Sequence, residues 1–212
     1  MILSLCIAGC GGYARKVLDD IRDMTDQFQF FFASRDLEKA ERYSREYGGA
    51  GAFGSYEEAA ADPRVDALYF LTPHDVHLEN LRVAARHAKH VLMEKPIARS
   101  VPEASSMVDV ARHAGIKLMV AENYRFLPAV AMAKEIMAQG PGGNAFGELR
   151  MIEIRQEGQS EPTGWRRNSE MVGGGAFIDG GIHLVDVMVN LGGLPERVHA
   201  IRLPQVFTGV EG

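Results

Sequence analysis

Cysteine and tryptophan are scarce in this chain of 212 residues, which has two cysteines and one tryptophan. Cys6 and Cys10 lie four positions apart, and in a strand that rises about 3.3 Å per residue such a pair is too widely separated for a disulfide bond. Two unpaired thiols are typical of a reducing compartment. We therefore expect a cytoplasmic protein without disulfide bonds.

The chain also lacks long apolar runs and clusters of positive charge. No window of about 18 apolar residues stands out, so we expect no membrane-spanning helix. The apolar N-terminus has no basic segment and runs into a glycine turn, which is typical of a strand rather than a signal peptide. The net charge is −5 and basic residues are scattered singly, which argues against binding to nucleic acid. Without clustered cysteine ligands or an HExxH pattern, we expect no catalytic metal.

Strand-like and helix-like patterns alternate over residues 1–121. Short apolar runs predict strands, and apolar residues at helical spacing lie between them. Such alternation with short connections is typical of a parallel sheet covered by helices on both faces. We therefore predict an α/β fold with a doubly wound parallel sheet of the Rossmann type over residues 1–121. The predicted strands cover residues 2–8, 28–33, 67–71, 90–93 and 117–121.

The pattern changes in residues 122–212. Residues 149–156 and 197–203 look like strands, and the glycines at 173–175 open a helix that runs to about Leu191. This mixture predicts a second, smaller α+β domain. Because two strands alone make a marginal sheet, we expect this domain to be incomplete.

The glycine turn after the first strand matches the dinucleotide-binding pattern GxGxx[GA]. It reads GCGGYA at residues 9–14 and opens an amphipathic helix. Gly9 would allow the tight turn, Gly11 the close approach of a pyrophosphate, and Ala14 the packing of helix on strand. The amides at the helix N-terminus would receive the anion. A glycine turn without a ligand is the alternative, which the strand–turn–helix context disfavours.

The end of the second strand bears on the choice of cofactor. NAD enzymes usually place Asp or Glu there for the ribose hydroxyls, whereas NADP enzymes use a small residue and an arginine. This chain has Ser34 followed by Arg35, whose guanidinium can grip a 2′-phosphate at two points. We expect NADP(H) as the preferred cofactor. In the alternative, Arg35 caps a helix and Asp36 binds the ribose of NAD(H).

Three further motifs follow in order along the chain. They are TPHDVH at residues 72–77, EKP at 94–96 and GGAFIDGGIHLVD at 174–186. With the glycine motif, they resemble the glucose–fructose oxidoreductase, inositol dehydrogenase and MocA (Gfo/Idh/MocA) family over nearly the whole chain. The resemblance implies longer chains with a large, mostly antiparallel sheet in the second domain, so we expect a truncated or partial form. It also implies a homo-oligomer, a dimer or tetramer, which the missing strands leave open.

The resemblance assigns the chemistry to three residues. Lys95 would lie at the substrate hydroxyl or carbonyl and stabilise charge on its oxygen. Asp179 and His183 share one face of a helix at four-residue spacing, with Asp186 less than a turn beyond. His183 would be the general base, with Asp179 positioning it or the substrate. A buried polar contact within the helix is the alternative for this pair.

The resemblance also implies which residues hold the two ligands. His77 would stack near the nicotinamide or the substrate, with an ordinary histidine on a helix face as the rival interpretation. Arg125 is interpreted as structural, and packing explains Trp165 equally well. The expected cofactor-binding residues are Gly9, Gly11, Gly12, Tyr13, Ala14, Ser34, Arg35, Thr72, Pro73, His77, Glu94 and Lys95, and the expected substrate-lining residues are Asn123, Tyr124, Trp165 and Arg166.

Together these features predict an NADP(H)-dependent oxidoreductase. It would transfer a hydride between nicotinamide and a secondary alcohol or ketone of a sugar, cyclitol or related polyol. Two alternatives share the architecture: an enzyme that cleaves glycosidic bonds with a tightly held NAD, and a non-catalytic regulator that senses dinucleotides. A regulator would be expected to lose the lysine, aspartate and histidine that this chain retains.

Overall fold

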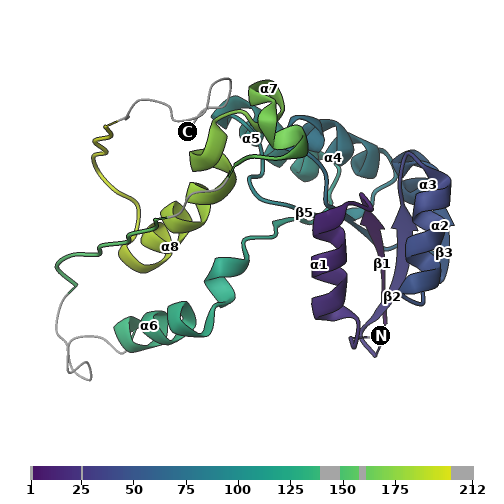
Figure 1. The fold of residues 1–212 in the computed structure, drawn as a ribbon, viewed down its shortest axis with the longest axis horizontal. Coiled ribbons are helices and arrows are strands. Elements are labelled where there is room, and N and C mark those ends of the chain that lie inside the picture. The colour runs from purple at the N-terminus through teal and green to yellow at the C-terminus, as the bar shows by residue number, and fades with distance from the viewer. Residues whose placement is uncertain (1, 25, 139–148, 158–160, 202–212) are drawn as a thin grey trace. The chain divides into compact units, whose positions relative to one another are not determined.

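The computed structural model describes residues 2–24, 26–138, 149–157 and 161–201, and Figure 1 shows them as a ribbon. The chain divides into two compact units, Met1–Ala121 and Glu122–Gly212. We call them the N-terminal unit and the second unit and describe each by itself.

Six parallel strands form the sheet of the N-terminal unit (Figure 1). Their order is β3-β2-β1-β4-β5-β6, so the chain winds outward from β1 in one direction and from β4 in the other. This order confirms the predicted Rossmann-type sheet. The strands are β1 (Leu3–Ala8), β2 (Phe28–Ala33), β3 (Gly51–Phe53), β4 (Ala67–Phe70), β5 (His90–Met93) and β6 (Leu118–Val120).

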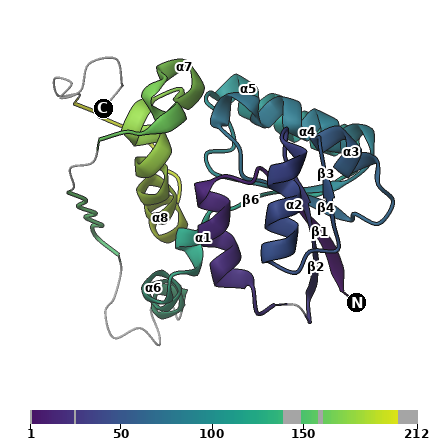
Figure 2. The same ribbon diagram turned by 45° about the vertical axis from the view of Figure 1, so that its right-hand side comes forward.

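Helices cover the two faces of this sheet in two groups (Figure 2). Leu18 and Tyr43 bring α1 and α2 against one face, while Leu81 and Met107 bring α4 and α5, with α3, against the other. Each face is therefore buried, which explains why the strands read as continuous apolar runs. The helices are α1 (Gly12–Ile21), α2 (Leu37–Glu46), α3 (Tyr56–Ala61), α4 (His77–Arg86) and α5 (Val101–His113), with a 3₁₀ turn η1 (His74–Val76) before α4.

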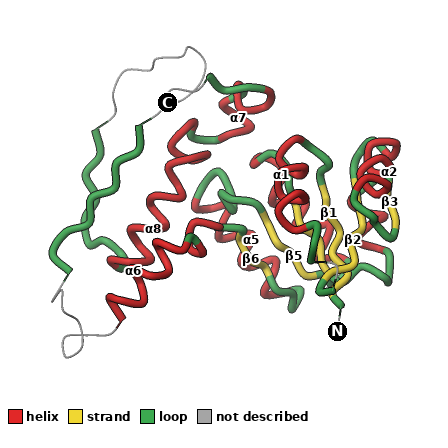
Figure 3. The backbone as a smooth tube through the Cα atoms, turned by 60° about the horizontal axis from the view of Figure 1, so that its bottom comes forward, coloured by secondary structure: helices red, strands yellow, loops and turns green. Residues whose placement is uncertain are grey.

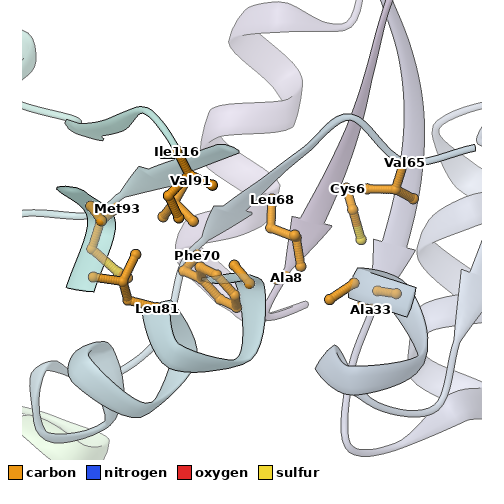
Figure 4. Packing of buried hydrophobic residues seen from close by; sticks show 14 of the residues in the cluster. Cys6, Ala8, Ala33, Val65, Leu68, Phe70, Leu81, Val91, Met93 and Ile116 are labelled. Carbon is orange, nitrogen blue, oxygen red and sulfur yellow. The ribbon is translucent and has the colours of Figure 1, made fainter. Parts of the chain in front are cut away.

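The carboxyl ends of β4 and β5 are anchored by large buried side chains. Phe70 and Met93, the last residues of these strands, pack with Leu81 of α4, and all three are fully buried (Figure 4). Burial of each such side chain contributes about 1.5–3 kcal/mol. The loops that follow the two strands therefore start from rigid positions.

Both cysteines are free and buried. Burial raises the pKa of the Cys6 thiol, and it raises the pKa of Cys10 to about 11. Both thiols therefore stay protonated at neutral pH and act as packing groups rather than as nucleophiles.

Every regular element that the structure describes in the second unit is a helix or a helical turn (Figure 3). The predicted strands are wrong where they can be compared, because residues 149–156 and 197–201 form no strand; residues 202 and 203 lie outside the described residues. Strand preference depends on packing against a paired neighbour, and an apolar pattern alone does not supply one. The elements are η2 (Asn123–Phe126), α6 (Pro128–Ala138), η3 (Gly164–Arg167), α7 (Ser169–Val172), the π-helical turn η4 (Phe177–Gly181) and α8 (Ile182–Gly192).

One segment of the second unit corrects the expectation that no window is apolar enough to span a membrane. Ser169–Gly192 contains an 18-residue window of mean hydropathy 1.3 and passes the test of length and composition. Two aspartates of this segment form ion pairs, Asp179 with Arg166 and Asp186 with Arg125. Core helices of soluble proteins pass the same test, so the window by itself assigns no membrane role.

Candidate functional site

The loop between β1 and α1 combines one crowded glycine with two open ones. Gly9 has a φ of +112°, and a Cβ there would lie 2.6 Å from the carbonyl oxygen of Leu71, which follows β4. At Gly11 and Gly12 a Cβ would meet no described atom within 4 Å. The loop is therefore packed against the sheet on one side and open on the other, as the close approach of a dinucleotide phosphate requires.

Helix α1 presents its first backbone amides at the open side of this loop. Its N-cap is Gly11, and the first turn of this described helix carries neither a capping side chain nor an acidic residue. The Tyr43 hydroxyl donates to the Gly11 carbonyl oxygen at 3.0 Å and tethers the loop to α2. Ala14 packs beneath it fully buried, and Tyr13 is exposed. These uncapped amides fit the pyrophosphate of a dinucleotide.

The residues after β2 are arranged so that the carboxylate of Asp36, not Arg35, caps the next helix. The Asp36 side chain accepts a hydrogen bond from the Lys39 backbone N–H at 3.2 Å, at the start of α2. The Asp36 backbone N–H donates to the hydroxyl of buried Ser34, and Arg35 is exposed. Burial raises the pKa of Cys10 in the glycine loop, and the positive charges of Lys39 and Arg42 on α2 oppose this rise.

His77 joins the loop after β4 to the loop after β5. Its Nδ1 lies 3.0 Å from the Pro96 carbonyl oxygen and its Nε2 lies 3.1 Å from the Thr72 carbonyl oxygen. The ring is fully buried, and burial lowers the pKa of His77. Asn80 donates to the Thr72 hydroxyl at 2.8 Å and fixes the same turn, where Pro73 is the N-cap of η1. This geometry favours the buried helix-face interpretation of His77; its stacking on nicotinamide stays a prediction.

The loop after β5 carries Lys95 next to a buried carboxylate. Glu94 is 6% exposed and accepts a hydrogen bond from the Tyr69 hydroxyl of β4. Burial, followed by the charge of Glu94, raises the pKa of Tyr69, so the phenol remains a neutral donor. Glu94 is thereby fixed in the sheet, and Lys95, half-buried, is the next residue beyond it.

In the second unit, His183 lies at the start of α8 against a glutamate from another element. Its Nδ1 is 2.6 Å from Oε1 of Glu122, the N-cap of η2, and the two side chains are 12% and 10% exposed. The Tyr124 ring stacks on the imidazole with the centroids 4.1 Å apart and the planes 10° apart. Sequence reasoning missed Glu122, although a carboxylate directly after a strand and before the predicted Asn123-Tyr124 pair was a usable signal.

Asp179 has an arginine partner of its own. Its Oδ2 lies 2.6 Å from Nε of Arg166, whose guanidinium carbon lies 4.6 Å from the centroid of the Trp165 ring. Asp179 sits in the π-helical turn η4, where the wider winding changes which residues share a face. The four residues from Asp179 to His183 therefore span a π-helical turn and the start of an α-helix, and the positioning of His183 by Asp179 stays a prediction. Its contact with substrate stays a prediction, as do those of Asn123 and Trp165.

Arg125 joins η2 to α8 by a two-point ion pair. Its Nε and Nη2 lie 2.7 and 2.6 Å from the two carboxylate oxygens of Asp186. This contact fits the structural role predicted for Arg125. It also fixes η2, and with it Glu122, to the helix that carries His183.

The predicted residues thus fall into two groups. The glycine loop, the end of β2, Thr72, His77, Glu94 and Lys95 belong to the N-terminal unit, whereas Tyr124, Arg166, Asp179 and His183 belong to the second unit. A joint constellation of Lys95 with Asp179 and His183 stays a prediction. No group of three or more metal-ligating side chains occurs in the part of the chain that the structure describes.

Two family models match the chain. The model described as "Oxidoreductase family, NAD-binding Rossmann fold" matches residues 3–122, and the model of the GFO/IDH/MocA C-terminal domain matches residues 130–210. The N-terminal unit is therefore a NAD-binding Rossmann domain.

Named relatives and solved structures give the same picture. Trans-1,2-dihydrobenzene-1,2-diol dehydrogenase of Oryctolagus cuniculus is 37% identical over 80% of this chain and 50% of its own length. D-xylose 1-dehydrogenase (NADP(+)) 2 of Haloferax volcanii is 33% identical over 97% of this chain and 62% of its own.

An oxidoreductase structure from Thermotoga maritima has a TM-score of 0.78 at 29% identity, covering 91% of this chain and 60% of that one. Levoglucosan dehydrogenase in complex with NADH and levoglucosan has a TM-score of 0.75 at 27% identity, covering 91% and 55%. This chain thus spans about half to three fifths of the length of these proteins.

Proposed function

Because the chain belongs to the Gfo/Idh/MocA family of oxidoreductases, we propose that it binds NADP(H) and interconverts a secondary alcohol and a ketone in a sugar, cyclitol or related polyol. Named relatives support this class, since they are a dihydrodiol dehydrogenase, a xylose dehydrogenase and a levoglucosan dehydrogenase.

One observation carries the proposal: three loops are tied together at one edge of the sheet. The glycine loop after β1 touches Leu71 after β4, and His77 bridges Thr72 after β4 to Pro96 after β5. Strands β1 and β4 are neighbours at the point where the strand order reverses, which is where open α/β sheets bind ligands. The dinucleotide loop and the loop with Lys95 therefore belong to one ligand-binding edge.

The residues have separate roles in the proposed reaction. A bound nicotinamide would supply the hydride acceptor for the substrate carbon. Lys95 donates a hydrogen bond to the substrate oxygen and stabilises the negative charge that develops as its O–H bond breaks. His183 takes that proton on Nε2, and in the reverse direction it returns the proton to the oxygen.

Substitution of Lys95 tests the proposal. We expect Lys95→Ala to lower kcat about 10²-fold or more with the best polyol of a panel. The affinity for NADPH, measured by its fluorescence, should fall by a much smaller factor, because the glycine loop still receives the pyrophosphate. Lys117→Ala is the matched control, because Lys117 is exposed and directly precedes β6, so it lies at the amino ends of the strands, whereas Lys95 follows the carboxyl end of β5. Full turnover in Lys95→Ala, or sugar release without net change in nicotinamide absorbance, would contradict the proposal.

The preference for NADP(H) is a separate proposal, which is supported by exposed Arg35 two residues beyond the end of β2. A charged hydrogen bond from Arg35 to a 2′-phosphate is worth about 1.5–3 kcal/mol. We therefore expect Arg35→Ala to weaken NADPH binding by about 10- to 100-fold and to leave NADH binding within about twofold. Fluorescence titration with both dinucleotides measures this. Equal losses for the two would show that Arg35 does not recognise the phosphate.

A further inference from the structure

The contact between Glu122 and His183 points to a role for a residue to which the sequence assigned none. We propose that Glu122 is the positioning residue for His183: its carboxylate holds the imidazole in the Nδ1–H tautomer, which leaves Nε2 as the proton acceptor. This inference rests on the general-base role of His183 in the proposed function.

The hydrogen bond between His183 and Glu122 has a defined direction. Nδ1 of His183 lies 2.6 Å from Oε1 of Glu122, a short distance of the kind found when an N–H donates to a charged carboxylate. An ionised carboxylate only accepts hydrogen bonds, so the hydrogen must be on Nδ1. A neutral imidazole has one N–H, and Nε2 is then the unprotonated nitrogen. Carboxylates fix the tautomer of catalytic and metal-binding histidines in the same way.

Further contacts fix both partners of this hydrogen bond, the Glu122 carboxylate and the His183 ring. Oε1 of Glu122 also accepts the Tyr124 backbone N–H at 3.1 Å, so the carboxylate is fixed to its own turn. The Tyr124 ring covers one face of the imidazole and restrains its rotation. With side chains only 12% and 10% exposed, water competes little for the contact, and the hydrogen bond is strengthened. Three contacts thus fix one ring orientation.

Asp179 is the carboxylate that the family resemblance implies for positioning His183 or the substrate. Its carboxylate is bound by Arg166, and the π-helical turn η4 separates it from the regular winding of α8. The carboxylate in hydrogen-bond contact with Nδ1 of His183 comes from η2, 61 positions away in the sequence, whereas that of Asp179 is paired with Arg166.

The variant Glu122→Gln tests the proposal by kinetics. The amide keeps the shape but no longer dictates the tautomer, since it can donate as well as accept. We expect kcat to fall about 10²-fold while the KM for substrate and the affinity for NADPH change by less than about threefold, because loss of an orienting partner typically costs about 10- to 100-fold. Glu122→Asp retains the carboxylate and should recover part of kcat.

Asp186→Asn is the matched control, because the Arg125–Asp186 pair joins the same two elements, η2 and α8, without touching the imidazole. If Glu122 only held η2 to α8, both variants would lower kcat alike. We expect Asp186→Asn to lower the melting temperature and to leave kcat within about threefold of the wild type. Equal losses of kcat in the two variants would overturn the proposal.

A spectroscopic measurement decides the proposal independently of activity. In protein labelled with ¹⁵N-histidine at alkaline pH, the His183 signals, assigned by their loss in His183→Asn, should show the Nδ1–H tautomer, and Glu122→Gln should change it. An Nε2–H tautomer in the wild type would overturn the proposal even if the variant failed to fold. A wild type with the Nδ1–H tautomer but no dehydrogenase activity would instead refute the proposed function and leave Glu122 as the group that sets the tautomer.

Discussion

The crowding at Gly9 predicts a large loss of stability from a single methyl group. In Gly9→Ala the new Cβ would lie 2.6 Å from the Leu71 carbonyl oxygen and 3.0 Å from its carbonyl carbon, and a φ of +112° is unfavourable for any L side chain. Leu71 backbone atoms follow an anchored strand and cannot rotate away. Backbone strain of this kind costs about 1–3 kcal/mol, and overpacking costs about 1–3 kcal/mol more.

We therefore expect Gly9→Ala to destabilise the N-terminal unit by about 4 kcal/mol. At about 2–4 °C per kcal/mol, its melting temperature without dinucleotide should fall by about 8–16 °C, which circular dichroism measures. Gly12→Ala is the control, because Gly12 is the first residue of α1 and its Cβ would meet no described atom within 4 Å. Alanine is the better helix former, so Gly12→Ala should melt at the same temperature or slightly higher. A loss of about 1 kcal/mol would lower the melting temperature by at least about 2 °C. A Gly9→Ala protein that melts within about 2 °C of the wild type would therefore contradict the destabilisation expected from the crowding at Gly9.

Two further predictions concern buried polar groups beside the same loops. Burial lowers the pKa of His77, so just below pH ~6.5 only the unfolded chain binds a proton at this site. The contribution of neutral His77 to stability is therefore complete above that pH and is lost as the pH falls. Urea midpoints measured from pH ~7.5 to ~5 should decline more steeply in the wild type than in His77→Gln, and equal slopes would contradict this. Tyr69→Phe removes a hydrogen-bond donor to buried Glu94 and should lower the free energy of unfolding in urea by about 1–3 kcal/mol. The control is Tyr47→Phe, whose lost hydroxyl donates to Asp19 near the surface, and it should lower that free energy by less than about 1 kcal/mol. Equal losses in the two variants would contradict the role of Tyr69.

The sheet of the N-terminal unit was predictable because its signals are local. A strand buried on both faces has to be apolar at nearly every position, and Leu3–Ala8 and Phe28–Ala33 lie within or coincide with the predicted apolar runs. The glycine turn likewise has a local cause, since its φ at Gly9 excludes other residues. The third strand, Gly51–Phe53, has no such signal, because three residues are too few to show a period and only pairing with β2 defines them.

The strands expected in the second unit do not form, because an apolar pattern indicates side chains that favour burial but does not show which neighbour would cover them. Four of the first six residues of segment 149–156 are apolar, which led to the prediction of a strand, yet Leu149 is 49% and Met151 78% exposed. Val198 and Ile201 in the other predicted strand are 81% and 80% exposed. Strand geometry depends on a neighbour that supplies hydrogen bonds and cross-strand packing, and the residues of one segment carry no information about that neighbour.

The surroundings of His183 show what spacing rules can and cannot find. Asp179 and His183 satisfy the four-residue rule, which pairs only residues that are neighbours along one helix. Glu122, which does contact His183, lies 61 positions away, so no periodicity could pair them. The sequence nevertheless held one clue: Glu122 directly follows β6 and directly precedes Asn123 and Tyr124, which were expected to line the substrate pocket, so its carboxylate was a candidate partner for a polar group of the site.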